Sequence, residues 1–123
     1  MIIAGIGFSS RVSADSLTEA LAAVAPPPAA IAVLRTKAGL AQFQEFAQTA
    51  ALPLISVEDS AISGVSTPSF SPRIQARFNT GSVAEALALV AARHHGADAQ
   101  LIHTRRVTSD GHATLAVAET IET

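Results

Sequence analysis

The chain has 123 residues, which favours one domain because a second core of ordinary size would not fit. Hydrophobic residues make up 49% and charged residues 15%, so the chain is neither disordered nor fibrous. Eight Lys and Arg against ten Asp and Glu leave a net charge of −2, and we therefore expect no nucleic-acid or anionic-membrane partner. The absence of Cys excludes disulfides, thiolate metal sites and a cysteine nucleophile.

No apolar stretch approaches the roughly 20 residues that a membrane span needs. The apolar run from Met1 to Ile6 is also too short for a secretory signal and lacks a basic segment before it. We therefore expect a cytoplasmic protein.

Apolar runs bounded by turn residues predict five strands. The last two flank Ser109-Asp110-Gly111-His112, in which the Asp-Gly pair is a strong hairpin indicator. The five predicted strands cover residues 2–6, 30–34, 54–57, 100–107 and 113–118.

Three stretches carry apolar residues with helical spacing. The first is capped by Ser13 and ends before Pro26; the second covers about residues 38–50, with Thr36 as its cap. The third opens with a capping box, Ser82 followed by Glu85, and closes at His94-His95-Gly96.

Two shorter helices are predicted between the third strand and the last long helix. Ser56 followed by Asp59 indicates one helical turn, and Ser71-Pro72 indicates a helix through about Phe78. Residues 63–71 lack periodicity and are rich in Ser, Thr, Gly and Pro, which makes them a candidate mobile flap.

The order β-α-β-α-β-(short helices)-α-β-β predicts the fold class. Strands that alternate with helices and end in a hairpin favour a single three-layer α/β domain over residues 1–123. Its sheet should be mixed, with about five strands and the antiparallel ones at one side.

Two glycine-containing loops precede predicted helices and are candidates for anion binding. Gly5 to Arg11 follows the first strand, and Asn79-Thr80-Gly81 precedes Ser82. Free N–H groups at a helix N-terminus suit carboxylate or phosphate, and Arg11 adds a bidentate donor. Lys37 follows the second strand and should reach the same sheet edge. The alternative is that both loops only turn the chain and that Lys37 is a solvated surface charge.

Other chemistry finds little support. No Ser-His-Asp arrangement is present, and neither nucleotide-binding glycine fingerprint is complete. The four histidines have no metal-ligand spacing, so we expect no metal and no cofactor. Arg105 and Arg106, adjacent on a strand, should point to opposite faces of the sheet.

Taken in order, several segments resemble the CobE / CbiG C-terminal domain family of cobalamin (vitamin B12) biosynthesis. The resemblance covers essentially the whole chain. It is carried by GIGFSSRVSADSLTEAL (residues 5–21), Lys37, VSTPS (65–69), SVAEALAL (82–89) and TLAVAE (114–119).

The resemblance implies a small α/β module, which occurs alone as CobE or fused behind another domain in CbiG, the enzyme that hydrolyses the lactone of cobalt-precorrin-5A. This chain looks like the stand-alone form. Phe8 stands where the family often has Cys, and Arg105 and Arg106 stand where many members have lysines. The Thr80-Gly81 loop also departs from the commoner pattern.

A precorrin carries acetate and propionate side chains, which the cationic loops would suit, with Phe8 or Phe70 touching the ring. We therefore expect an accessory protein that binds a precorrin or corrin intermediate, as carrier or protector. The alternatives are a hydrolase acting on a precorrin-5-type lactone, or a module that docks onto another pathway enzyme. The expected ligand-binding residues are Gly5, Gly7, Phe8, Ser9, Ser10, Arg11, Lys37, Ser66, Thr67, Ser69, Thr80, Gly81, Ser82 and Glu85.

Overall fold

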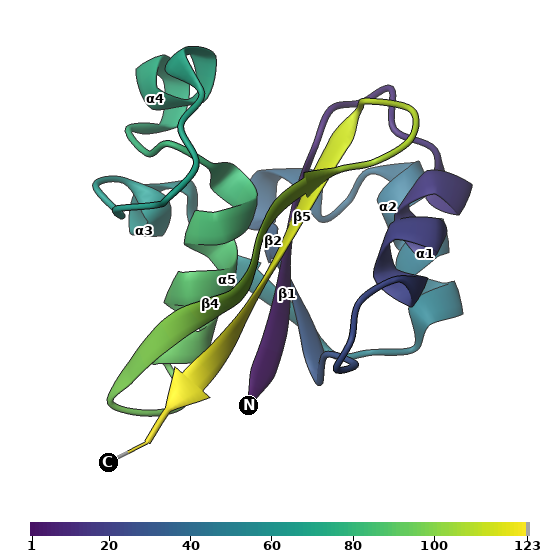
Figure 1. Ribbon diagram of the computed structural model, residues 1–123. Coiled ribbons are helices and arrows are strands. Elements are labelled where there is room, and N and C mark those ends of the chain that lie inside the picture. The colour runs from purple at the N-terminus through teal and green to yellow at the C-terminus, as the bar shows by residue number, and fades with distance from the viewer. Residues whose placement is uncertain (123) are drawn as a thin grey trace.

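A computed structural model describes residues 1–122 and shows a central sheet of five strands (Figure 1). The strands lie in the order β3–β2–β1–β5–β4. Their bounds are β1 (Ile2–Phe8), β2 (Ala30–Leu34), β3 (Leu54–Val57), β4 (Asp98–Val107) and β5 (Ala113–Ile121).

The sheet is mixed, as the sequence predicts. β1, β2 and β3 run parallel, whereas β5 pairs antiparallel with both β1 and β4. β4 therefore runs in the same direction as β1. In consequence, the carboxyl ends of four strands and the start of β5 meet at one edge of the sheet.

Helices cover both faces of the sheet, giving the predicted three layers (Figure 1). α1 (Ala14–Ala22) and α2 (Ala41–Ala50) lie on one face, and α5 (Val83–Arg93) lies on the other beside α3 (Asp59–Ile62). α4 (Pro72–Phe78) stands beyond the N-terminal end of α5. No helix among residues 1–122 is long and apolar enough to cross a membrane.

Alternate residues of β1 divide the core into two apolar clusters, because successive strand side chains point to opposite faces. Ile3 packs with Leu87 on the α5 side, and Ile6 packs with Phe43 and Phe46 on the α1–α2 side. All five side chains are fully buried. At roughly 1.5–3 kcal/mol for each large apolar side chain, these layers hold the helices firmly against the sheet.

Gly5 allows α5 to approach β1 at backbone contact. A Cβ at this position would lie 2.2 Å from Ala84 O and 2.6 Å from Ala88 N, both backbone atoms of α5. The sequence interpretation assigned Gly5 to ligand binding, but its place in the structure is this helix–strand contact.

Most predicted elements are confirmed to within a few residues, and the second helix shows the clearest difference. Residues 35–37 form a 3-10 turn, and α2 begins only at Ala41, with Leu40 at its N-cap. The Thr36 hydroxyl does not cap this helix, because it donates to the Asp59 carboxylate at 3.1 Å. The predicted cap is therefore wrong.

Replacing Gly5 with Ala should destabilise the protein by at least about 2 kcal/mol, because a methyl group cannot fit against helix backbone without moving α5. Urea unfolding followed by circular dichroism measures this, since the chain has no Trp or Tyr. Gly39→Ala is the matched control: its Cβ would have no atom within 4 Å. Equal midpoints for the two variants would show that the close approach is unimportant.

Candidate functional site

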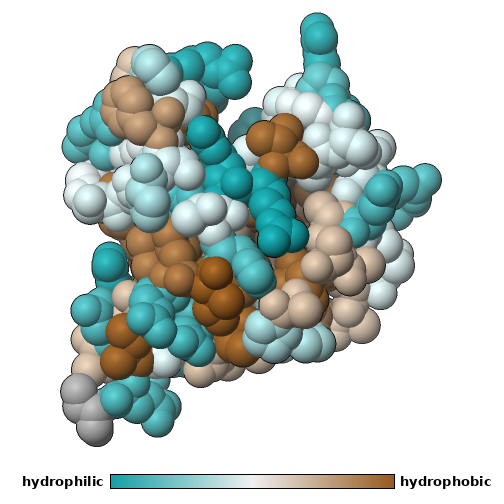
Figure 2. All heavy atoms as spheres, in the orientation of Figure 1, coloured by the Kyte–Doolittle hydropathy of each residue, from teal (hydrophilic) through white to brown (hydrophobic). Residues whose placement is uncertain are grey.

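A cleft of about 660 Å³ lies at the sheet edge where the strand ends meet. Its walls come from the end of β1 and the loop after it, from the end of β2, from α4, from the start of α5, and from the β4–β5 hairpin. Figure 2 shows the surface notched between α4 and the tip of this hairpin. The cleft is within the size range that binds small molecules in other proteins.

Positive charge is concentrated in this cleft. Five of the eight Lys and Arg residues line it, and no Asp or Glu does. Among residues 1–122, none of the five forms an ion pair. The five are Arg11, Lys37, Arg73, Arg77 and Arg105.

The other three cationic side chains lie outside the cleft. Arg35 pairs with Glu58 at 2.7 Å, and Arg93 pairs with Asp98 at 3.2 Å. Arg106 lines a separate, smaller pocket. A chain with a net charge of −2 thus has five of its six cations without an ion pair, among residues 1–122, gathered at one edge of the sheet.

The loop after β1 presents Arg11 from a fixed position. Val12, buried to 1% exposure, anchors the loop in the core, and its N–H donates to Ser9 O at 3.1 Å. The Gln42 side chain of α2 donates to Ser10 O at 2.8 Å. The Arg11 side chain is exposed at the end of this turn, which the two hydrogen bonds hold in place.

Two cations on α4 complete the opposite wall. Arg73 and Arg77 lie four residues apart, so they share a face of the helix. The helix begins with Pro72, as predicted, and ends where Asn79 takes a left-handed conformation at φ 57°. The Arg77 guanidinium lies 5.1 Å from the centre of the Phe78 ring. Sequence reasoning found the helix but missed this i, i+4 arginine pair.

Arg105 and Arg106 lie on opposite faces of the sheet, in a stretch of β4 whose pairing with β5 is irregular. Its register with β5 shifts between Leu101 and His103, and again between His103 and Arg106. Arg105, which has no partner residue in β5, lines the cleft, whereas Arg106 lies opposite Leu115. The predicted divergence of Arg105 and Arg106 is confirmed.

Aromatic rings provide apolar surface inside the cleft. Phe8 lines it and stacks on Phe43, with ring centres 5.1 Å apart and planes within 6°. Phe78 contributes from α4. Phe70, the other ring expected to touch a ligand, is 62% exposed and lies outside the lining.

Asp110 organises the hairpin at the rim of the cleft. Its carboxylate accepts from Thr108 Oγ1 at 2.7 Å, from His112 N at 3.0 Å and from Ser13 N at 3.2 Å. These hydrogen bonds, the one from Thr108 first, hold the pKa of Asp110 well below its usual range. The contact with Ser13 joins the hairpin to the loop that carries Arg11.

The structure divides the predicted ligand-binding residues into two groups. Seven of them line the cleft: Gly7, Phe8, Ser9, Ser10, Arg11, Lys37 and Ser82. Seven lie outside its lining: Gly5, Ser66, Thr67, Ser69, Thr80, Gly81 and Glu85.

Residues 63–71, the candidate flap, are fastened to the body of the protein. Thr80 Oγ1 donates to Val65 O at 2.7 Å, and Ser71 N donates to Gly81 O at 2.9 Å. A Cβ on Gly81 would lie only 2.4 Å from Ser69 O, so the segment packs directly against the backbone of Gly81. These contacts argue against a mobile flap.

Of the two helix N-termini predicted to face a ligand, that of α5 lines the cleft through Ser82 and Val83, whereas Ser13 at the start of α1 lies outside its lining. Ser82 Oγ accepts from Glu85 N at 3.3 Å, which confirms one half of the predicted capping box. The other half is absent because the Glu85 side chain bonds to Ser69 and Arg105 instead.

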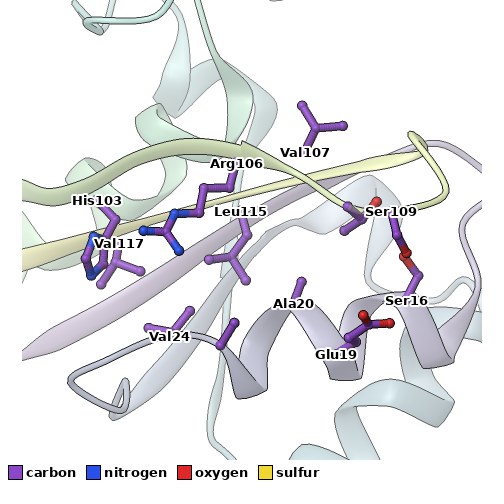
Figure 3. A pocket seen from close by; sticks show the side chains of 12 residues that line it. Ser16, Glu19, Ala20, Val24, His103, Arg106, Val107, Ser109, Leu115 and Val117 are labelled. Atoms are coloured by element: carbon purple, nitrogen blue, oxygen red, sulfur yellow. The ribbon is translucent and has the colours of Figure 1, made fainter.

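A second pocket of about 210 Å³ lies between α1 and the β4–β5 hairpin (Figure 3). Val24 beside α1 and Leu115 and Val117 on β5 line it from opposite sides, and Glu19 of α1 and Arg106 of β4 carry opposite charges there. Its mixed charge makes it a weaker candidate for an anionic ligand than the cleft. Across residues 1–122, no three His, Asp or Glu residues are grouped so as to hold a metal ion.

Comparison with known proteins identifies the family. The model of the family described as "Cobalamin synthesis G C-terminus" matches residues 2–118. The chain belongs to this family. It is thereby a protein of the cobalamin biosynthesis pathway, as its resemblance to CobE and CbiG predicts.

Solved structures agree with the family match. The crystal structure of CobE, a protein from the cobalamin (vitamin B12) biosynthetic pathway, is 26% identical with a TM-score of 0.77, over 96% of this chain and 92% of that one. The cobalamin biosynthesis protein chiG from Agrobacterium tumefaciens str. C58 is 28% identical with a TM-score of 0.73, over 99% and 100% respectively. A search of curated proteins gave no significant match.

Because Asp110 has a lowered pKa when folded, its contribution to stability should be present above about pH 4 and should decline as the pH falls further. The melting temperature of Asp110→Asn should therefore lie below that of the wild type at pH 7, with the gap narrowing between about pH 4 and pH 2. Thermal unfolding by circular dichroism measures both. A gap that stays constant over this range would contradict the assigned role.

Proposed function

We propose that the protein binds a precorrin or corrin intermediate through its carboxylate side chains, as an accessory carrier or protector in cobalamin biosynthesis. The observation that carries the proposal is the cleft with five unpaired cations and no lining carboxylate. An internal structural role would pair such charges with acidic residues, as the protein does for Arg35 and Arg93.

The spread of the cations favours a ligand with several carboxylates. Arg11 and Lys37 come from the β1 and β2 side, Arg73 and Arg77 from α4, and Arg105 from β4. A monocarboxylate could engage only one or two of these groups. Since single exposed ion pairs contribute only about 0.2–1 kcal/mol, useful affinity requires one ligand that reaches several cations at once.

The apolar part of the cleft suits the ring of such a ligand. Phe8, Ile74 and Phe78, all partly exposed, line it. Apolar contact contributes about 25 cal/mol per Å² removed from water, which would add to the ionic contacts at the rim. A macrocycle bordered by carboxylates combines both properties.

The lactone-hydrolase alternative receives less support from the lining. Hydrolysis needs an acid and a base placed together, and the lining offers His112 but no Asp or Glu. The neighbouring Asp110 carboxylate accepts hydrogen bonds from Thr108, Ser13 and the His112 backbone within the protein. Binding therefore accounts for more of the cleft than turnover does. The docking alternative predicts that no pigment binds, so the experiments below separate it from the proposal.

The Arg11→Ala, Lys37→Ala double variant should weaken binding of hydrogenobyrinic acid, a corrin bearing carboxylates, by at least tenfold. The dissociation constant can be measured from the pigment's absorption in gel-filtration fractions, because a protein without Trp or Tyr absorbs little at 280 nm. Raised salt should weaken wild-type binding as well, since it screens exposed charges.

The matched control is the Arg35→Ala, Arg93→Ala double variant, which removes the same kind of charge outside the cleft and should bind like the wild type. The methyl-esterified corrin supplies a ligand control and should bind weakly. If wild type and both double variants bind the acid equally, the cleft is not the binding site. If no pigment co-elutes with the wild type, the docking alternative takes the place of the proposal.

Arg73→Ala with Arg77→Ala should also lower the affinity by at least tenfold, because α4 supplies one wall of the cleft. Ser66→Ala, in the segment outside the lining, should leave the dissociation constant within twofold of the wild type. The same absorption measurement compares the two. A larger loss for Ser66→Ala than for the arginine pair would place the ligand on residues 63–70, outside the cleft, instead.

A further inference from the structure

Glu85 is a fully buried carboxylate that does not line the cleft. Its Oε1 accepts from Ser69 N at 2.9 Å. Its Oε2 accepts from Ser69 Oγ and from Arg105 N, both at 2.7 Å. The side chain therefore meets hydrogen-bond donors from two segments, one before α4 and one in β4.

Burial of a carboxylate without a cation is costly, and the fold compensates it locally. Within residues 1–122 no Lys, Arg or His side chain pairs with Glu85. Three donors and a place in the first turn of α5, at the positive end of the helix dipole, offset the lost hydration. Replacing Glu85 with Gln would turn one of these oxygen acceptors into an NH₂ donor, which would then face an N–H group of Ser69 or Arg105.

On the β4 side, Glu85 supports an irregular strand. Arg105 lies between His103 and Arg106, where the register with β5 shifts, and it has no partner residue in β5. Its N–H donates to Glu85 rather than to the sheet. The bulge held in this way directs Arg105 into the cleft while Arg106 lines the pocket on the other face.

On the other side, Glu85 fixes the segment that leads into α4. Ser69, which gives it two hydrogen bonds, lies three residues before Pro72, the first residue of that helix. α4 carries Arg73 and Arg77. The Glu85 carboxylate thus links β4, which carries Arg105, to the segment that leads into α4 and its two arginines.

We propose that Glu85 is a positioning residue of the cleft, which sets Arg105 and the α4 arginines at the spacing that a polycarboxylate ligand requires, without touching that ligand. This inference rests on the proposed function. It gives Glu85 a role different from direct ligand binding, because all of its carboxylate contacts are within the protein.

Glu85→Gln should weaken binding of hydrogenobyrinic acid by at least tenfold while the far-ultraviolet circular dichroism remains that of a folded protein. Glu45→Gln, an exposed change on α2, is the matched control and should bind like the wild type. Amide exchange should quicken by at least tenfold at Ser69 or at Arg105, because glutamine keeps one oxygen and only one of these two N–H groups retains its acceptor. If Glu85→Gln does not fold, Ser69→Ala, which removes one of the three bonds, should lower the affinity about threefold.

Coupling to Arg105 separates positioning from general support of the fold. Glu85→Gln should cost at least threefold less affinity in an Arg105→Ala background than in the wild type, whereas independent effects would multiply. Wild-type binding with unchanged affinity in Glu85→Gln would overturn this inference and leave the proposed function standing. The inference would also be overturned if the losses of affinity caused by Glu85→Gln and by Arg105→Ala simply multiplied in the double variant. Failure of the wild type to bind would overturn the proposed function itself.

Discussion

The close packing of α5 against β1 is the constraint on which the arrangement of the cleft depends. Gly5 brings the helix backbone against the strand, and Gly7 meets Val83 one turn nearer the sheet edge. This contact puts the start of α5 beside the ends of the parallel strands. It also sets Glu85, in the first turn, within reach of both β4 and the segment that leads into α4.

Charge placement then distinguishes the sheet edge from the rest of the surface. Arg35 and Arg93 have acidic partners, whereas the cations around the cleft have none among residues 1–122. Elements far apart in sequence supply these cations, because the sheet order brings the loop after β1, the end of β2, α4 and β4 together. The topology, rather than any local motif, builds the cationic surface.

Sequence patterns predicted the elements well where hydrophobic periodicity and turn chemistry agreed, as in β2, β3, α4 and the hairpin at Gly111. They predicted Arg11 and Lys37 at the cleft because both follow parallel strands. They failed where a side chain had a distant partner: Thr36 bonds to Asp59, and Glu85 bonds to Ser69 and Arg105. Such partners are set by tertiary packing and leave no local pattern. The arginines of α4 were missed because nothing in the sequence places that helix over the sheet edge.

If the cationic cleft holds a polycarboxylate corrin, the ligand should contact residues from every wall of the cleft, and this contact can be mapped residue by residue. Backbone amide chemical shifts of the isotope-labelled protein, followed by NMR as hydrogenobyrinic acid is added, would locate the ligand. We predict that the shifted amides cluster in residues 6–11, 71–78 and 111–114, together with Lys37 and Arg105. Shifts confined to the pocket between α1 and the hairpin, or no shifts at saturating pigment, would contradict the account.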